Sequence, residues 1–214
     1  MNDVAIGPVA QMMKDGCWDL HKSAENGAVA KKMISGELSK GSYVELAKQM
    51  YLFNRALDQA IMRHRATTPA LQNLIADEQL QAPYYEQDLA YFGEPLEGLV
   101  PSPGAAEAIA LIERIETEQP RNLLALHYVR EGANNGNRFV AKKLMQVWDT
   151  GPEGFSHLDP YGEAQRAKWE AFKAALNEQP FTAEQKLSLV ATGRSMFEAV
   201  MAIHRDIEVV SPVG

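Results

Sequence analysis

The sequence has little cysteine, no long apolar run and no excess of positive charge. Cys17 is the only cysteine among 214 residues, so the chain cannot form an intramolecular disulfide and suits a reducing compartment. The segment from Met1 to Val4 lacks the basic flank and apolar core of a signal peptide, and the chain has no run of about 18 apolar residues, the length that a membrane span needs. We therefore expect a cytoplasmic protein without a membrane anchor.

The charge balance argues against one large class of partners. The formal net charge is −7, whereas a protein that binds nucleic acid needs a concentrated positive surface to contact phosphates. Hydrophobic residues make up 46% of the chain, without a break in composition, which is enough for one sizeable core. We predict a single domain over residues 1–214 that is monomeric and does not bind nucleic acid.

Apolar residues recur every three to four positions along most of the chain, and no run alternates convincingly with the period of two that a strand requires. Ser39 precedes an apolar stripe that continues to Ile61, and serine is a typical helix-capping residue. These patterns predict an all-α fold of roughly seven or eight helices. The expected helices cover residues 4–34, 39–61, a stretch after Pro69, 83–92, 105–118, 122–148, 161–177 and 182–207.

The first predicted helix carries His21 and Glu25 one turn apart on the same face. A neutral imidazole binds a metal through one ring nitrogen while the other donates a hydrogen bond to an acceptor such as a carboxylate. The pair therefore suits a metal ligand and its orienting partner. The spacing alone is weak evidence because it recurs at His204 and Glu208, and an isolated helical histidine is more often a surface or core residue.

A second unusual segment, residues 128–138, interrupts a good helix with Gly132, Gly136 and three asparagines. Each internal glycine costs about 1 kcal/mol relative to alanine. Because two glycines four positions apart leave the backbone bare on one face, a flat ligand can approach it closely, with Asn134 as a neutral donor or acceptor beside it. The alternative explanation is a kinked or broken helix, or close packing against another helix.

Taken together, these motifs resemble the soluble, bacterial type of heme oxygenase over about residues 10 to 205. The family's proximal-ligand pattern is a histidine followed by two variable positions, alanine and glutamate, and it matches His21, Ala24 and Glu25. Further matches are Tyr43 through Leu57-Asp58, Asp88-Leu89 after Glu78, and Glu131-Gly132 with Gly136. The resemblance implies a helical fold in which heme lies between a proximal helix and a kinked distal helix.

The resemblance also implies roles for individual residues. His21 would be the axial ligand of the heme iron, and Glu25 would fix its tautomer and orientation. On the distal side, Gly132 and Gly136 would allow the close approach of heme, and Asn134 would hold ordered water. Candidate partners of the heme propionates are Lys14, Tyr128, Arg166 and Lys168, although Tyr128 also fits a core tyrosine and the basic residues also fit a solvated surface.

The reaction that the resemblance implies is oxidative cleavage of heme to biliverdin, carbon monoxide and ferrous iron. Dioxygen is the co-substrate, and electrons come from a donor such as a ferredoxin or an NAD(P)H-dependent reductase, so heme is both substrate and cofactor. Many family members carry an aspartate directly after the first distal glycine, where this chain has Ala133. Without that carboxylate, either backbone groups such as those of Asn134 hold the water or oxygen activation is impaired.

Two other classes of function stay open on the sequence alone. Ala133 keeps a non-catalytic heme carrier or sensor on the same fold as an alternative. Other proteins with this fold use di-iron chemistry or hydrolyse thiamine. However, the chain contains no Glu-x-x-His pair of the kind that di-iron bundles use, and Cys17, which is followed by Trp18, is more typical of a buried thiol than of a nucleophile.

Overall fold

The computed structural model describes the backbone of residues 6–210 and the side chains of residues 6–207. Within these residues the chain forms nine α-helices, three short 3₁₀-helices and no strand, which confirms the all-α prediction. The α-helices are α1 (Val9–Glu25), α2 (Ala28–Ser35), α3 (Lys40–Arg65), α4 (Pro69–Leu74), α5 (Ala82–Tyr91), α6 (Pro103–Glu118), α7 (Leu123–Trp148), α8 (Gln165–Asn177) and α9 (Ala183–Val210). The 3₁₀-helices η1 (Asp77–Gln79), η2 (Pro120–Asn122) and η3 (Gly162–Ala164) precede α5, α7 and α8.

The expected seven or eight helices are too few, because the predicted segment 4–34 is two helices. Helix α1 ends at Glu25, and α2 begins after Gly27, whose extended backbone (φ −61°, ψ 151°) interrupts the helical turn. Asn26 and Gly27 both have low helix propensity, which explains the break. The predicted start of the segment at Val4, like both ends of the predicted domain, lies outside the described residues.

Capping residues set the ends of several helices. The Ser39 hydroxyl accepts a hydrogen bond from the backbone N–H of Ser42 (3.1 Å) at the start of α3, as its position before the apolar stripe predicted. Ser102 caps α6 in the same way through the N–H of Ala105 (3.3 Å). Gly36 ends α2 with a φ of 80°, a left-handed conformation that glycine adopts without steric cost.

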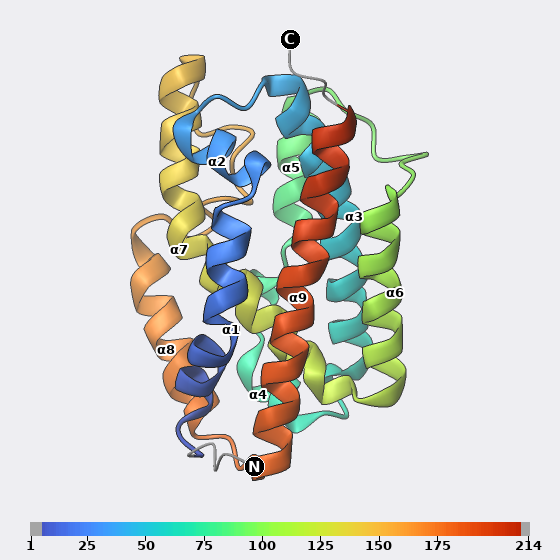
Figure 1. Cartoon of the computed structure of the whole chain (residues 1–214), viewed down its shortest axis with the longest axis vertical. Helices are drawn as coiled ribbons and strands as arrows, with labels where there is room; N and C mark the ends of the chain where they lie inside the picture. Colours follow the sequence, from blue (N-terminus) through green and yellow to red (C-terminus); the bar gives the residue numbers. More distant parts are fainter. Residues whose placement is uncertain (1–5, 211–214) are drawn as a thin grey trace.

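The helices pack around one hydrophobic core. Figure 1 shows α1 and α9 side by side at the front of the bundle, with α3 and α6 on one side and α7 and α8 on the other. Helix α3 buries Tyr43, Phe53, Leu57 and Ile61, and one continuous hydrophobic cluster includes residues from every α-helix. Among the described residues, no helix combines the length and apolar character that a membrane span requires.

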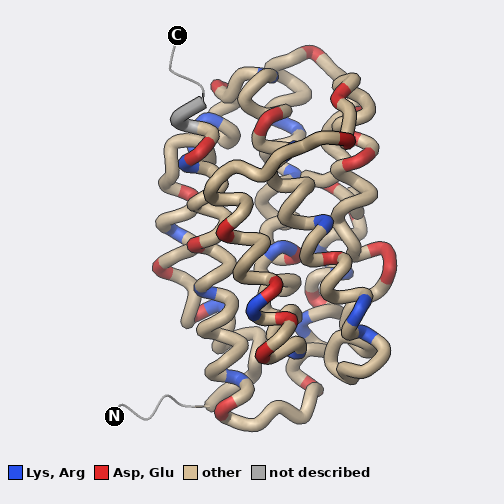
Figure 2. The backbone as a smooth tube through the Cα atoms, turned by 90° about the vertical axis from the view of Figure 1, so that its right-hand side faces the viewer, with Lys and Arg blue, Asp and Glu red and all other residues tan. Residues whose placement is uncertain are grey.

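Acidic and basic residues are interspersed along the helices, as the colours of the backbone in Figure 2 show. Several of them form ion pairs between helices, such as Arg194 with Asp19 (2.6 Å) and Arg63 with Glu116 (2.6 Å). Pairs that lie this close to the surface stabilise the fold by about 1 kcal/mol or less each. The hydrophobic cluster therefore contributes more to the stability of the bundle than these surface charges do.

Two glycines bring α1 and α9 into close contact. A Cβ atom on Gly193 of α9 would lie 2.6 Å from Cε of Met13 and 3.2 Å from Sγ of Cys17, and a Cβ atom on Gly16 of α1 would overlap Val190. Because protein interiors are close-packed, a larger residue at either position would push the helices apart. The contact fixes α1 against α9 just before the turn that carries His21.

Helix α7 is continuous from Leu123 to Trp148 although it contains Gly132 and Gly136. Figure 1 shows that it first crosses obliquely behind α1 and then turns upward along the edge of the bundle. The helix therefore bends without breaking, which agrees with the kinked distal helix that the sequence predicted.

Candidate active site

A cavity of about 900 Å³ lies between α1 and α7. His21 and Glu25 line it from α1, and Gly132 and Gly136 line it from α7. The volume falls in the range of about 300–1,000 Å³ that small-molecule sites occupy. The fold thus brings together two motifs that lie far apart in the sequence.

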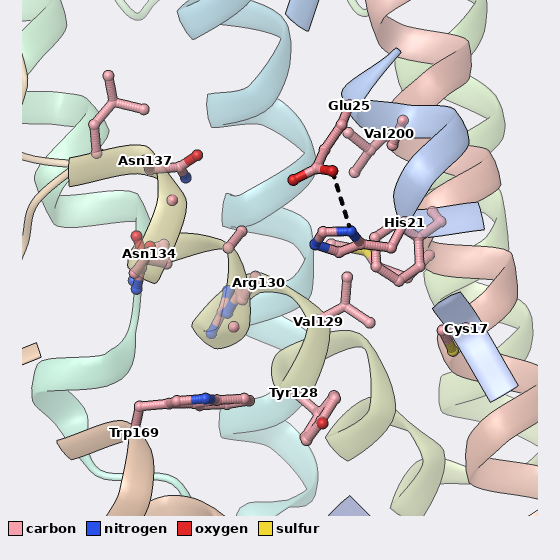
Figure 3. Close-up of a pocket in the computed structure, with 18 of the residues that line it drawn as sticks. Cys17, His21, Glu25, Tyr128, Val129, Arg130, Asn134, Asn137, Trp169 and Val200 are labelled. Atoms are coloured by element: carbon pink, nitrogen blue, oxygen red, sulfur yellow. Dashed lines mark ion pairs between the residues drawn. The ribbon is translucent and has the colours of Figure 1, made fainter. Parts of the chain in front are cut away.

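The His21 ring lies on the α1 side of this cavity, beside Glu25 (Figure 3). Its Nδ1 is 3.6 Å from Oε2 of Glu25, which is too long for a hydrogen bond, and it has no other hydrogen-bond partner among the described residues. The ring stacks on Trp18 with centroids 5.2 Å apart, and its edge meets Phe197 at 5.8 Å. Because Nδ1 faces Glu25, Nε2 is the ring nitrogen that is available to a metal.

The two glycines of the opposite wall have different surroundings. A Cβ atom on Gly136 would meet no atom within 4 Å, so this position borders open space. A Cβ atom on Gly132 would lie 3.4 Å from the Trp169 indole of α8. A side chain on Gly132 would therefore meet α8 at ordinary van der Waals distance, whereas Gly136 leaves the backbone bare toward the cavity.

Asn134 is a buried polar side chain of the α7 wall, across the cavity from His21 in Figure 3. It is 3% exposed, and its Nδ2 has no hydrogen-bond partner among the described residues. A buried amide donor without a protein partner is a place where water or a ligand binds. Ala133, where the resemblance located the missing carboxylate, also lines the cavity, but it is exposed and has no polar side-chain atom. The position that decides the polarity of this wall is therefore Asn134.

The structure changes the set of basic residues that face the cavity. Lys14 lines it, as predicted, but neither Arg166 nor Lys168 does. Lys168 is turned away to Glu78 (2.6 Å) on η1 and covers the Tyr161 ring. The face of α8 that borders the cavity instead carries Trp169, Glu170, Lys173, Ala174 and Asn177. Lys173, whose Nζ lies 3.0 Å from Oε1 of Glu170, is therefore the basic residue of α8 that the sequence analysis missed, because the rotation of α8 follows from tertiary packing.

Tyr128 proves to be a core tyrosine. Its hydroxyl donates a hydrogen bond to the backbone oxygen of Ala10 (3.0 Å), and its ring packs against Trp169 at a centroid distance of 5.1 Å. Burial raises the pKa of this hydroxyl well above its usual value, so it stays protonated. Tyr128 lines the cavity with its ring, but its polar atom links α7 to α1 and is already satisfied.

The closed end of the cavity contains buried polar residues from several elements. Tyr85 of α5 stacks on His157 of the loop before α8, with ring centroids 4.1 Å apart, and both residues line the cavity. Nδ1 of His157 lies 2.6 Å from Oδ2 of Asp88, which also accepts the backbone N–H of His157 (2.9 Å). The sequence indicated Asp88 only as part of a motif and gave no signal for Tyr85 or His157, because their contact depends on chain folding.

Arg130 connects the cavity wall to the core. Its Nη1 lies 2.6 Å from Oδ1 of Asp58, with both side chains about 5% exposed, and its Nε donates to Nδ1 of His127 (3.1 Å). Burial lowers the pKa of His127 well below its usual value, so that ring is neutral and can accept this bond. The other Asp58 oxygen accepts the N–H of Ala82 (2.7 Å). The network joins α3, α5 and α7 around the closed end.

Cys17 lines the cavity from α1, one turn before His21. The residue is buried, and burial raises the pKa of its thiol to about 11. A thiol with so high a pKa is almost entirely protonated at neutral pH and is a poor nucleophile. The structure therefore favours the buried-thiol interpretation of Cys17 over a catalytic one.

A flat ligand suits the gap between the His21 imidazole and a wall that exposes bare backbone at Gly136. Lys14 and Lys173 favour acidic groups on the edge of that ligand. These features define a helical protein that binds heme. The chain belongs to the heme oxygenase family, whose sequence profile matches residues 8–206.

Relatives cover nearly the whole chain. The heme oxygenase of Pyropia yezoensis is 24% identical over 208 residues, which are 94% of this chain and 87% of that protein. The solved structure of heme oxygenase-1 from Synechocystis sp. PCC6803 in complex with heme has a TM-score of 0.87 and 19% identity, with 95% of this chain and 94% of that one covered. The heme oxygenase of Leptospira interrogans has a TM-score of 0.87 and 22% identity, with 94% and 100% covered. These two structures share the fold of this chain.

Proposed function

We propose that this protein is a heme oxygenase that binds heme between α1 and α7 and cleaves it to biliverdin, carbon monoxide and ferrous iron. The observation that carries the proposal is the cavity of about 900 Å³ with His21 on one side and bare helix backbone at Gly136 on the other. Bound heme supplies the iron centre at which dioxygen is activated. The protein binds the macrocycle, orients it and limits access of water.

The residues around the cavity divide this work. Nε2 of His21 would ligate the iron, and the negative charge of the Glu25 carboxylate, 3.6 Å from Nδ1, would favour the tautomer that carries its proton on Nδ1. Lys14 and Lys173 would pair with the propionates at the open end. The proton-bearing Nδ2 of Asn134 would hold water next to the α7 wall, so that the water and not a carboxylate carries protons there.

The remaining features of the proposal concern the cellular setting. We infer a single domain that acts as a monomer in the cytoplasm and receives electrons from a ferredoxin or an NAD(P)H-dependent reductase. Support comes from the single hydrophobic cluster of the described residues and from the lone, buried Cys17. The exposed side of the cavity around Lys14 and Trp18 would offer a route for electrons from a docked protein.

The test is turnover of hemin with ascorbate or a reductase as electron donor. Growth of the biliverdin absorption band with release of carbon monoxide supports the proposal. A hemin complex that is reduced and stays intact contradicts it and supports the alternative, a heme carrier on the same fold, in which the amide of Asn134 does not organise water for catalysis.

Replacing Lys14 and Lys173 together with alanine is expected to weaken hemin binding by roughly 10-fold, because each partly exposed ion pair contributes up to about 1 kcal/mol. Titration of hemin followed in the Soret band measures the affinity. The matched control is the double replacement of Arg166 and Lys168 with alanine, which removes two charges from α8 outside the cavity and should leave the affinity within about twofold. If the control loses more hemin affinity than the Lys14 and Lys173 variant, Arg166 and Lys168 are the residues that bind the propionates.

Replacing Gly136 with leucine is expected to reduce hemin affinity by roughly 10- to 100-fold without loss of helical structure. The new side chain would enter open space that the ligand needs, and overpacking costs about 1–3 kcal/mol. Gly41→Leu is the control, because Gly41 is also helical and its Cβ atom would also meet nothing within 4 Å, but it lies outside the cavity. Equal hemin affinity in both variants would mean that the ligand does not contact α7 at Gly136.

A further inference from the structure

Tyr85 and His157 form a polar pair at the closed end of the cavity. Their rings are stacked with an interplanar angle of 21°, and both residues are 6% exposed. Neither the Tyr85 hydroxyl nor Nε2 of His157 has a hydrogen-bond partner among the described residues. The neighbouring hydroxyl of Tyr43, by contrast, donates to the backbone oxygen of Gly154 (2.8 Å) and is satisfied. Two unsatisfied polar groups thus border a cavity that is otherwise largely apolar.

Asp88 determines which hydrogen-bonding roles this pair can play. Its carboxylate accepts the backbone N–H groups of Ser156 (2.8 Å) and His157 (2.9 Å), and it lies 2.6 Å from Nδ1 of His157. Since a carboxylate oxygen accepts hydrogen bonds, this contact places a proton on Nδ1, and in the singly protonated ring Nε2 is then an acceptor. Burial raises the pKa of Tyr85 well above its usual value, so its hydroxyl stays a donor. The pair therefore offers one donor beside one acceptor.

Intact heme has no group that matches such a pair. Its four nitrogens bind the iron, and its acidic propionates are drawn to Lys14 and Lys173, of which Lys14 is exposed at the open end. The edge of heme that points to the closed end is then hydrocarbon. Oxidative opening of the ring changes this, because each end of the linear tetrapyrrole becomes a lactam with an N–H donor and a C=O acceptor side by side.

We propose that Tyr85 and His157 bind a terminal lactam of the linear tetrapyrrole product, the Tyr85 hydroxyl donating to the lactam oxygen and Nε2 of His157 accepting the lactam N–H. The closed end of the cavity then recognises the product and not the substrate. The other charged groups near the pair, Asp58 and Arg130, are bound to each other at 2.6 Å and do not compete for the lactam. The inference rests on the proposed function, because that function places a linear tetrapyrrole in this cavity.

The experiment compares the affinities of biliverdin and hemin in the heme-free protein. Trp18 and Trp169 line the cavity, so quenching of tryptophan fluorescence reports binding of biliverdin, and the Soret band reports binding of hemin. Tyr85→Phe removes only the hydroxyl, and His157→Phe removes the acceptor but keeps an aromatic ring. Each variant is expected to weaken biliverdin binding by roughly 3- to 10-fold, as the loss of one hydrogen bond implies. Hemin affinity should stay within about twofold.

Tyr84→Phe is the matched control, because Tyr84 is the adjacent tyrosine of α5, its hydroxyl donates to the backbone oxygen of Glu78 (2.9 Å), and it does not line the cavity. An unchanged biliverdin affinity in Tyr85→Phe, or an equal loss for both ligands, overturns the inference and leaves the pair as a water site or a structural contact. Tyr85→Phe keeps the bonds of Asp88 intact, so it decides the question even if His157→Phe does not fold. A wild-type protein that binds no hemin would contradict the proposed function itself. Normal hemin turnover by the wild type, together with Tyr85→Phe and His157→Phe variants that do not lose biliverdin affinity selectively, would refute only the lactam site.

Discussion

Replacement of His21 with alanine is expected to lower hemin affinity by more than about 100-fold and to abolish formation of biliverdin. Loss of a residue that hydrogen-bonds to a metal ligand already lowers metal affinity or activity by about 10- to 100-fold. In His21→Ala the ligand itself is removed. The stacked Trp18 and the edge of Phe197 would remain, so the cavity keeps its shape. A titration of hemin monitored in the Soret band, followed by turnover with ascorbate, measures both effects. Added imidazole should restore part of the spectrum by filling the vacated position.

A second histidine in the cavity provides the control for the assignment of His21 as the iron ligand. His204 of α9 also lines the cavity, and burial lowers its pKa to about 4, so its ring is a neutral imidazole at pH 7 that could ligate a metal. His204→Ala should keep the hemin spectrum of the wild type. If the Soret band survives in His21→Ala and is lost in His204→Ala, the iron ligand lies on α9 and the role assigned to His21 is wrong.

Replacement of Asp58 with alanine is expected to destabilise the protein by about 3–5 kcal/mol, because it leaves the buried Arg130 guanidinium without its counter-charge. This is a large part of the total stability of about 5–15 kcal/mol of a typical protein. The N–H of Ala82 at the start of α5 would also lose its acceptor. Urea unfolding followed by circular dichroism measures the change, and we expect a clear shift of the midpoint to lower denaturant.

Asp77→Ala provides the comparison, since Asp77 also lies 2.6 Å from an arginine, Arg65, but its side chain is 82% exposed. An ion pair of the same length at the surface should contribute less than about 1 kcal/mol to the free energy of unfolding, because water solvates both charges. The two variants therefore separate the effect of burial from that of ion-pair geometry. Similar losses of stability in both would show that the Asp58 and Arg130 pair is hydrated in solution.

Local sequence signals predicted most of the fold. The apolar period of 3.6 residues places α3, α6, α7 and α9 within a few residues of their observed bounds, and Ser39 marks the start of α3 through its hydroxyl. The break between α1 and α2 was missed because the apolar pattern continues across Gly27, where only the backbone conformation changes. The His21 and Glu25 pair was predictable for the same local reason, since a spacing of four residues determines proximity on any helix.

The rest of the site depends on contacts that no local pattern encodes. Lys173 and not Lys168 faces the cavity because packing against Gly132 and Tyr128 sets the rotation of α8 about its axis through Trp169. Tyr85 and His157 meet only after α5 and the loop before α8 are brought together by Asp88. Gly132 and Gly136 looked equivalent in the sequence, and both line the cavity, yet only Gly132 also lies next to Trp169 of α8.

The close contact between α1 and α9 influences the width of the cavity. Gly16 and Gly193 let the two helices approach until Met13, Cys17 and Val190 meet the opposite backbone. His21 follows on the next turn of α1, so its distance from the α7 wall depends on how deeply α1 is seated on α9. Neither Gly16 nor Gly193 lines the cavity, yet substitution of either glycine would move His21 relative to the α7 wall and so change the width of the proposed heme site.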